Sequence, residues 1–263
     1  MRVVISAGGT GGHIYPALAI INKIKEMEPN SEFLYIGTTN RMEKDLIPSM
    51  GYRYEGIEVT GFKRKLTLDN FKTITNFINA IKRCKIIIKD FDPDIVIGCG
   101  GYVTAPVIYA AKKLGKKTFI HEQNSVVGLA NKFLARYTDK IGVSFESTIK
   151  DFPKGKAILT GNPCSEKALS IKKTTKEKLD IAKDKKLVLI VMGSLGSKVI
   201  NDRMKEILPK FSNKDYEILF ITGKDYYDEF SSLKLGKNIK VFDYIDNMKK
   251  VFKKVDVMVS RAG

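Results

Sequence analysis

Close to the N-terminus, the sequence has a glycine-rich segment that ends in a histidine. The apolar run 3–7 leads into Gly8-Gly9-Thr10-Gly11-Gly12-His13, and a helix is expected from about Pro16. Backbone N–H groups in such a loop can approach an anion closely, and the N-terminus of the following helix carries partial positive charge. An imidazole titrates near neutral pH, so His13 is a candidate general base for an attacking hydroxyl; the alternative is a histidine that only caps the helix. The segment predicts a diphosphate-binding loop.

Two common nucleotide-binding motifs do not fit this segment. In the dinucleotide pattern G-x-G-x-x-G counted from Gly9, the third glycine is replaced by Ile14. The phosphate-binding pattern G-x-x-x-x-G-K-[ST] does not occur anywhere in the chain. A dehydrogenase or an ATPase is therefore disfavoured.

Glycine loops occur three times, each at the end of an expected strand. They are residues 8–12, 98–104 and 193–196. In open α/β sheets, ligands bind at the carboxyl ends of the strands. Tight packing between a strand and a helix also selects glycine, which is the alternative for any single loop. Three loops in equivalent places favour a phosphate-bearing ligand.

Strand-like and helix-like runs alternate along the chain. We expect strands at 32–37, 94–98 and 117–121, followed by helices from about Arg41, after Thr104 and after Ser125. This alternation indicates an α/β protein with parallel, doubly wound sheets.

The pattern pauses at Gly161-Asn162-Pro163 and restarts with an expected strand at 186–192, after a lysine-rich stretch at 171–176 with a helix start. We therefore expect one domain over 1–162 and a second over 163–263. The last strand, 255–259, has no crossover helix after it, and a parallel strand needs one to cover its sheet. The second domain is expected to be incomplete, either because the natural chain continues or because the product is truncated.

Two further segments attract attention. The polar motif His121-Glu122-Gln123-Asn124 ends a strand, and His121 by itself is expected to be a core histidine. A helix expected over 69–90 follows the basic segment 61–66 and carries an apolar stripe edged by lysine and arginine, made of Phe71, Ile74, Phe77, Ile78 and Ile81. Such a stripe suits an anionic membrane surface, although a core-facing stripe is the alternative.

Composition limits the class of protein. The chain of 263 residues is 43% hydrophobic and has a formal net charge of +17, which favours a polyanionic partner or simply a solvated basic surface. The three cysteines, Cys84, Cys99 and Cys164, form no C-x-x-C pair, so we expect neither a disulfide framework nor a zinc site, and a reducing cytoplasm fits best. No signal peptide or spanning segment is expected.

Seven motifs, taken in order, carry a resemblance to a known family. They are residues 8–13, 100–103, 121–124, 161–163, 193–196, 244–248 and 260–263. Together they resemble the membrane-associated N-acetylglucosaminyltransferases of peptidoglycan synthesis, in glycosyltransferase family 28. The resemblance implies a GT-B fold, in which two doubly wound Rossmann-like domains face a cleft. It also implies inverting transfer of N-acetylglucosamine from UDP-N-acetylglucosamine to the C4 hydroxyl of lipid I, the undecaprenyl-diphospho-muramoyl-pentapeptide, to give lipid II.

The resemblance also implies roles for individual residues. His13 would be the base, and Glu122 an acid–base or supporting residue. Contacts to the UDP-sugar would come from Thr10, Gly11, Gly12, Asn124, Ser194 and Ile245. The acceptor diphosphate would lie at Gly100, Gly101 and Tyr102. No cofactor or metal is expected, because the third glycine loop and its helix would face the UDP phosphates in place of a metal ion.

The implied setting is the cytoplasmic face of the cell membrane, with peripheral attachment. The expected partners are UDP-N-acetylglucosamine, lipid I, the anionic membrane surface and other cell-wall synthesis proteins. Nucleic acid is not expected, since no motif for it accompanies the charge.

The sequence also departs from the family pattern. Ser165 stands where the family usually has an arginine that contacts the donor, and a serine cannot supply a charged fork of donors. The family also continues beyond the motif at 260–263. The alternatives are therefore a truncated fragment that binds only lipid or membrane, and another GT-B protein, such as a diacylglycerol glycosyltransferase or a UDP-sugar epimerase.

Overall fold

The computed structural model describes residues 1–60, 69–165, 181–182, 184–193, 196–245 and 248–261. The basic segment 61–66, the stretch at 171–176 and Ser194 lie outside the described residues. The chain divides into two compact units, Met1–Lys167 and Ala168–Gly263. Each unit is described by itself.

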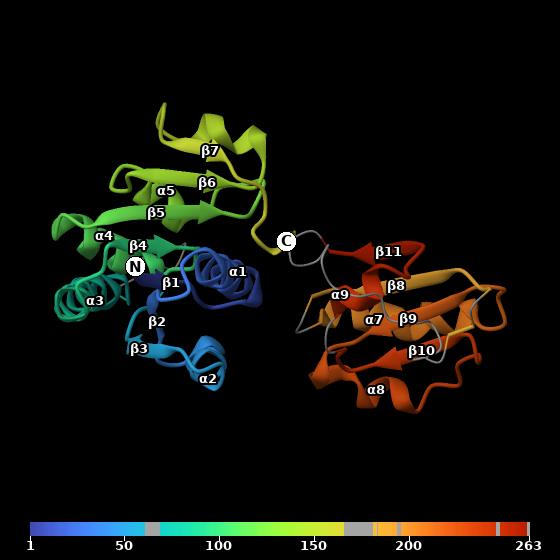
Figure 1. Ribbon diagram of the computed structural model, residues 1–263. Coiled ribbons are helices and arrows are strands. Elements are labelled where there is room, and N and C mark those ends of the chain that lie inside the picture. Colours follow the sequence, from blue (N-terminus) through green and yellow to red (C-terminus); the bar gives the residue numbers. More distant parts are fainter. Residues whose placement is uncertain (61–68, 166–180, 183, 194–195, 246–247, 262–263) are drawn as a thin grey trace. The chain divides into compact units, whose positions relative to one another are not determined.

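The first unit is built on a seven-stranded sheet in which every pair of neighbours is parallel (Figure 1). The strand order is β3-β2-β1-β4-β5-β6-β7. The strands are β1 (Arg2–Ser6), β2 (Glu32–Thr38), β3 (Arg53–Ile57), β4 (Ile95–Gly98), β5 (Lys117–Glu122), β6 (Lys140–Val143) and β7 (Ala157–Leu159). Their central members are nearly continuous runs of buried apolar residues, as expected for parallel strands covered on both faces.

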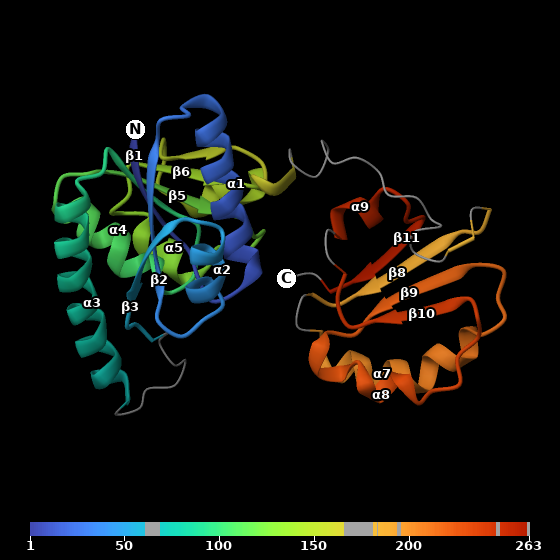
Figure 2. The ribbon, with the colours of Figure 1, turned by 60° about the horizontal axis from the view of Figure 1, so that its bottom comes forward.

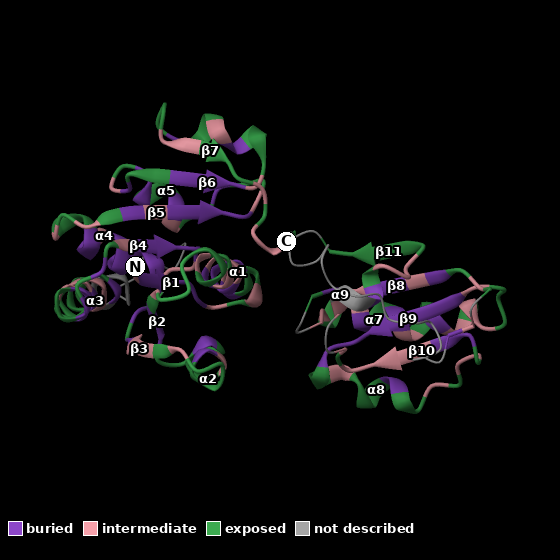
Figure 3. Cartoon of the chain, in the orientation of Figure 1, coloured by how far each residue is buried: buried purple, intermediate pink, exposed green. Residues whose placement is uncertain are grey.

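Helices cover both faces of this sheet (Figure 2). Side chains of α1 (Gly11–Met27) and α2 (Glu43–Ser49) form one core layer with Val3 and Ile5 of β1. The opposite layer includes Val4, and its helices are α3 (Asp69–Phe91), α4 (Thr104–Lys113) and α5 (Leu129–Leu134). Successive side chains of β1 thus point alternately into the two core layers. Figure 3 shows that the interiors of the strands are buried.

The second unit has a four-stranded parallel sheet with the order β10-β9-β8-β11. The strands are β8 (Leu187–Val191), β9 (Glu217–Ile221), β10 (Ile239–Phe242) and β11 (Val257–Ser260). One face packs against α7 (Lys198–Ile207) and α8 (Asp228–Ser231), and the other against α9 (Met248–Phe252). The predicted alternation of strands and helices is therefore confirmed in both units.

Both sheets reverse their strand order at one place. In the first unit, the chain goes from β1 outward to β2 and β3, then returns to β4 on the other side of β1. The neighbours β8 and β11 have the same relationship in the second unit. The carboxyl ends of such strand pairs form the crevice where doubly wound proteins bind ligands.

The structure corrects the predicted start of the first helix and shows how the apolar stripe on α3 is placed. Helix α1 begins at Gly11 and not near Pro16, because the Thr10 carbonyl already accepts the N–H groups of His13 and Ile14. Both alternatives for the stripe on α3 apply in part, since Ile74 and Ile78 are each nearly half exposed while Ile81 packs against the core. The side chain of Phe71 lies outside the described residues. Other positions of α3 also make core contact, namely Ala80, Cys84, Ile87, Ile88 and Phe91.

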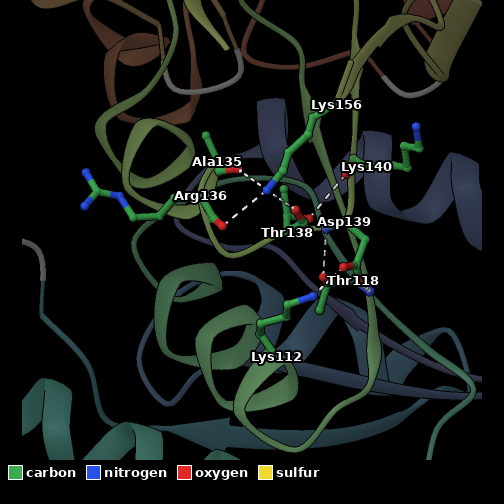
Figure 4. A network of polar contacts seen from close by, with 8 residues as sticks. All are labelled: Lys112, Thr118, Ala135, Arg136, Thr138, Asp139, Lys140 and Lys156. Atoms are coloured by element: carbon green, nitrogen blue, oxygen red, sulfur yellow. Dashed lines mark hydrogen bonds and ion pairs between the residues drawn. The ribbon is translucent and has the colours of Figure 1, made fainter. Parts of the chain in front are cut away.

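A lysine fastens the connection between α5 and β6 (Figure 4). The Lys156 Nζ donates to the carbonyls of Ala135, Arg136 and Thr138 at 3.1, 3.2 and 2.8 Å. These carbonyls follow the last turn of α5, where a cation is favoured. The Lys156 ammonium group therefore stabilises the segment between α5 and β6.

Candidate functional site

The first two glycine loops interlock at the crevice of the first unit. They follow β1 and β4, the adjacent strands where the order reverses. The Gly8 N–H donates to the Gly100 carbonyl at 3.3 Å, and the Thr104 hydroxyl donates to the same carbonyl at 2.8 Å. A Cβ on Gly101 would collide with the carbonyl of Gly8. The absence of side chains therefore lets the two loops pack backbone against backbone.

The N-terminus of α1 opens directly from the first loop. Thr10 is its N-cap, makes no side-chain capping bond and is exposed, and Gly11 and Gly12 form the first turn. No acidic side chain lies in that turn. Backbone N–H groups at a helix start whose first turn has no carboxylate favour an anion.

His13 lies within this first turn, so it is part of the helix and does not precede it. Its Nδ1 is 3.3 Å from the Thr10 hydroxyl oxygen, and the ring also bonds to the Gly8 backbone. Burial lowers the pKa of His13 below its ordinary value of 6.5, although the Gly8 bond and the charges of Glu122 and Glu43 oppose this shift. The shift favours the neutral imidazole.

The second loop has a tyrosine at its edge. Gly100 has a φ of +96°, which favours glycine, and Tyr102 is half-buried beside it. The Arg41 guanidinium hydrogen-bonds the Tyr102 side chain, and this contact raises the pKa of Arg41. A cation thus lies beside the second glycine loop.

Glu122 organises the turn that follows β5. It is buried, and its Oε1 accepts the backbone N–H and the side-chain amide of Asn124 at 2.9 and 3.0 Å. Its Oε2 accepts the Gly128 N–H and the Asn131 amide at 3.0 and 2.9 Å. Both carboxylate oxygens are used by the protein, so the supporting role fits Glu122 better than proton transfer with substrate.

The other members of the polar motif face inward. His121 is buried, with its Nε2 3.0 Å from the Gly161 carbonyl, and burial lowers its pKa. The Gln123 side chain donates to the carbonyl of Cys99, beside the second glycine loop. These contacts tie the end of β5 to the end of β4 and leave Asn124, which is half-buried, as the motif's outer residue.

An apolar cavity of about 610 Å³ opens beside the glycine loops. His13, Gly101 and Tyr102 form part of its wall, and the rest includes Phe77 and Phe133. The rings of Phe77 and Phe133 meet edge to face with centroids 6.2 Å apart. The volume is within the range that small-molecule sites occupy.

In the second unit, the third glycine loop follows β8. Gly196 has a φ of +72°, and a Cβ there would collide with the carbonyl of Thr222 at the end of β9. Ile245, after β10, packs against the core formed by β8, β9 and α9. Of the two expected donor residues in this unit, Ile245 thus follows a strand at the carboxyl side of the sheet, and Ser194 lies outside the described residues. Ser165 in the first unit is exposed, and its N–H donates to the Asn162 carbonyl.

Glu43 is a residue of this site that the sequence analysis missed. Its carboxylate is fully buried and accepts the Gly9 N–H at 3.2 Å. A single acidic residue at the start of a short helix gives no sequence signal for a contact 34 residues away. Among the described residues, no cluster of three His, Cys, Asp or Glu side chains could hold a metal ion.

Comparisons with known proteins agree with this geometry. The N-terminal domain of glycosyltransferase family 28 matches residues 3–143, and the C-terminal domain of the same family matches residues 187–263. A curated relative from Bacillus cereus is named UDP-N-acetylglucosamine–N-acetylmuramyl-(pentapeptide) pyrophosphoryl-undecaprenol N-acetylglucosamine transferase 1. It is 47% identical over all of this chain, which spans 74% of that relative.

Solved structures agree as well. The crystal structure of MurG from Acinetobacter baumannii, at 27% identity, matches all of this chain and 74% of its own, with a TM-score of 0.73. A UDP-GlcNAc 2-epimerase from Neisseria meningitidis, at 16% identity, covers all of this chain and 78% of its own with a TM-score of 0.65, which shows a shared fold only. The chain therefore has the GT-B fold and belongs to glycosyltransferase family 28, among the relatives of MurG.

Proposed function

We propose that this chain is the transferase that its relatives' names describe. It moves N-acetylglucosamine from UDP-N-acetylglucosamine to the C4 hydroxyl of the N-acetylmuramyl-pentapeptide of lipid I, and the product is lipid II. The observation that carries the proposal is the pair of interlocked glycine loops with His13 at the crevice between β1 and β4. We take the backbone N–H groups at the start of α1 as the anion-binding donors and His13, in the same turn, as the base.

The chemistry is a direct displacement with inversion. The acceptor C4 oxygen forms the new bond to the anomeric carbon as the bond from that carbon to the UDP oxygen breaks, and the hydroxyl proton passes to His13. The neutral imidazole has one ring nitrogen with a free lone pair, and that nitrogen receives the proton.

The leaving group and the acceptor need separate anion sites. The second unit's glycine loop and the N-terminus of α7 are suited to the charge that develops on UDP, with Ser194 and Ile245 as further donor contacts. In the first unit, Thr10, Gly11, Gly12 and Asn124 are further proposed contacts to the donor. The backbone of Gly100 and Gly101, with Tyr102 beside them, would hold the acceptor diphosphate.

A lipid-linked acceptor suits the surface around this site. The apolar cavity shares His13, Gly101 and Tyr102 with the loops, and Leu129 at its wall is 77% exposed. Ile74 and Ile78 of α3 add exposed apolar surface. None of the described helices is long and apolar enough to cross a membrane. We propose peripheral attachment at the cytoplasmic leaflet, where the net charge of +17 favours anionic lipids.

The experiment that tests the function compares the wild-type chain with His13→Ala. With a short-chain lipid I analogue and labelled donor, we expect the variant to lose about 10²- to 10⁴-fold in kcat and little in donor KM. Equilibrium dialysis with UDP-N-acetylglucosamine gives the control, because an intact fold keeps donor binding. Equal turnover in both proteins would remove His13 from the mechanism.

A further inference from the structure

Glu43 is a buried carboxylate that the transfer chemistry described above does not use. It opens α2, and its two oxygens have different partners. Oε1 accepts the backbone N–H and the hydroxyl of Thr38 at 3.2 and 2.7 Å. Oε2 accepts the Gly9 N–H at 3.2 Å. One oxygen is therefore held by the end of β2, while the other holds the first glycine loop.

The contact reaches both glycine loops and the base. A Cβ on Gly8 would collide with Oε1 of Glu43, so the carboxylate lies directly against the loop backbone. The Gly8 N–H donates to the Gly100 carbonyl, and the Gly8 backbone also bonds to the His13 ring. A displacement of Glu43 would thus move the loop on which the imidazole rests.

The negative charge of Glu43 also acts on the pKa of His13. Burial lowers the pKa of His13, and the negative charges of Glu122, from β5, and Glu43, from α2, oppose that shift. The charge of Glu43 also raises the pKa values of Tyr35, Tyr54 and Arg41. A buried negative charge stabilises a nearby imidazolium more than a neutral ring.

We propose that Glu43 is a positioning residue for transfer: it fixes the first glycine loop through Gly9 and stabilises the imidazolium that His13 becomes on accepting the hydroxyl proton. The role in transfer rests on the proposed function. The structural part, a carboxylate that sets both the loop and the proton affinity of His13, does not depend on turnover.

The chain is well suited to a direct test because it contains only two histidines. NMR titration of labelled imidazoles gives both pKa values, and His13→Asn assigns the signals. We expect Glu43→Gln to lower the pKa of His13 and to leave His121 unchanged, since the carboxylate charge acting on His121 comes from Glu122. Thr38→Val removes one bond to Glu43 but keeps its charge, so it should change neither value. An unchanged His13 pKa in Glu43→Gln would overturn the proposal.

A shorter carboxylate covers the case in which Glu43→Gln does not fold. Glu43→Asp keeps the negative charge but moves it away from Gly9. The pKa of His13 should therefore fall by less than in Glu43→Gln. Binding of inorganic pyrophosphate should be weaker in Glu43→Asp than in Thr38→Val. If Glu43→Asp and Thr38→Val had the same His13 pKa and the same pyrophosphate affinity, the proposal would be contradicted.

The transfer assay separates this inference from the function itself. In an active wild type, Glu43→Gln should lower kcat by about 10- to 100-fold, with a shift of the acid limb to lower pH that Thr38→Val does not show. Loss of rate without that shift would mean a purely structural role and would overturn the electrostatic part. An inactive wild type would refute the proposed function, while the NMR titration would still decide the role of Glu43.

Discussion

His13 rests on the backbone of Gly100. A Cβ on Gly100 would lie 2.6 Å from Cδ2 and 3.1 Å from Nε2 of the imidazole. His13 belongs to α1 and Gly100 to the loop after β4, so the ring contacts both glycine loops. The position of the proposed base is therefore set by the second loop as much as by its own helix.

A methyl group at Gly100 should displace the imidazole. Gly100→Ala places a Cβ against His13 at a φ of +96°, and we expect a loss of about 1 to 3 kcal/mol in unfolding free energy together with at least a tenfold loss in kcat. Gly115→Ala is the matched control, because Gly115 also has a positive φ but no atom within 4 Å of the new Cβ. Chemical denaturation and transfer kinetics measure both effects. Equal kcat in the two variants would contradict a role for the contact.

The pH profile follows from the direction of the His13 shift. A base must be neutral, and burial lowers the pKa of His13 below 6.5, so the midpoint of the acid limb of transfer should lie below pH 6.5. Stability should fall over the same acid range, because both histidines bind protons more weakly in the folded chain than in the unfolded one. An acid limb above pH 6.5 in kcat would be inconsistent with His13 as the base.

We expect Glu122 to support the fold of the turn after β5 and not to transfer a proton. Glu122→Gln replaces an acceptor with an amide donor that faces N–H groups, so we expect about 1 to 3 kcal/mol lower unfolding free energy and weaker donor binding through Asn124. Glu146→Gln, at an exposed glutamate, should change neither quantity. If Glu122→Gln kept wild-type stability and lost only kcat, an acid–base role would be indicated.

Membrane attachment can be tested on α3. Ile78 is 48% exposed, and Ile78→Asp adds a negative charge to the proposed membrane surface. Sedimentation with phosphatidylglycerol vesicles should show weaker binding for this variant than for wild type. Val199→Asp on α7, an equally charged change at an exposed apolar residue of the second unit, should bind like wild type. Equal binding by all three proteins would place the contact elsewhere.

Local sequence patterns predicted the elements that carry the candidate site. Each glycine loop is a short stretch of neighbouring residues, so it can be recognised in the sequence. The apolar strands before these loops, such as β1 and β8, are short uninterrupted runs. Alternation of these strands with helices was enough to predict parallel, doubly wound sheets. The start of α1 was missed because Gly11 and Gly12 are poor helix formers, although their position at the helix N-terminus suits an anion site.

Tertiary contacts account for what could not be predicted. Glu43 reaches Gly9 only because β1 and β2 are neighbours, and nothing near Glu43 in the sequence marks that contact. Likewise, periodicity identified α3 but not which of its faces is buried, because Ile78 and Ile87 are equally apolar and only packing against α4 separates them.

The most direct test of the central claim is transfer by this 263-residue chain itself. The purified protein is incubated with labelled UDP-N-acetylglucosamine and a short-chain lipid I analogue, and the product's linkage and anomeric configuration are determined by mass spectrometry and NMR. The proposed function predicts a disaccharide with a β linkage to the C4 oxygen and a pH profile governed by His13. Bound acceptor without any transferred sugar would contradict it and would indicate a chain that only binds lipid.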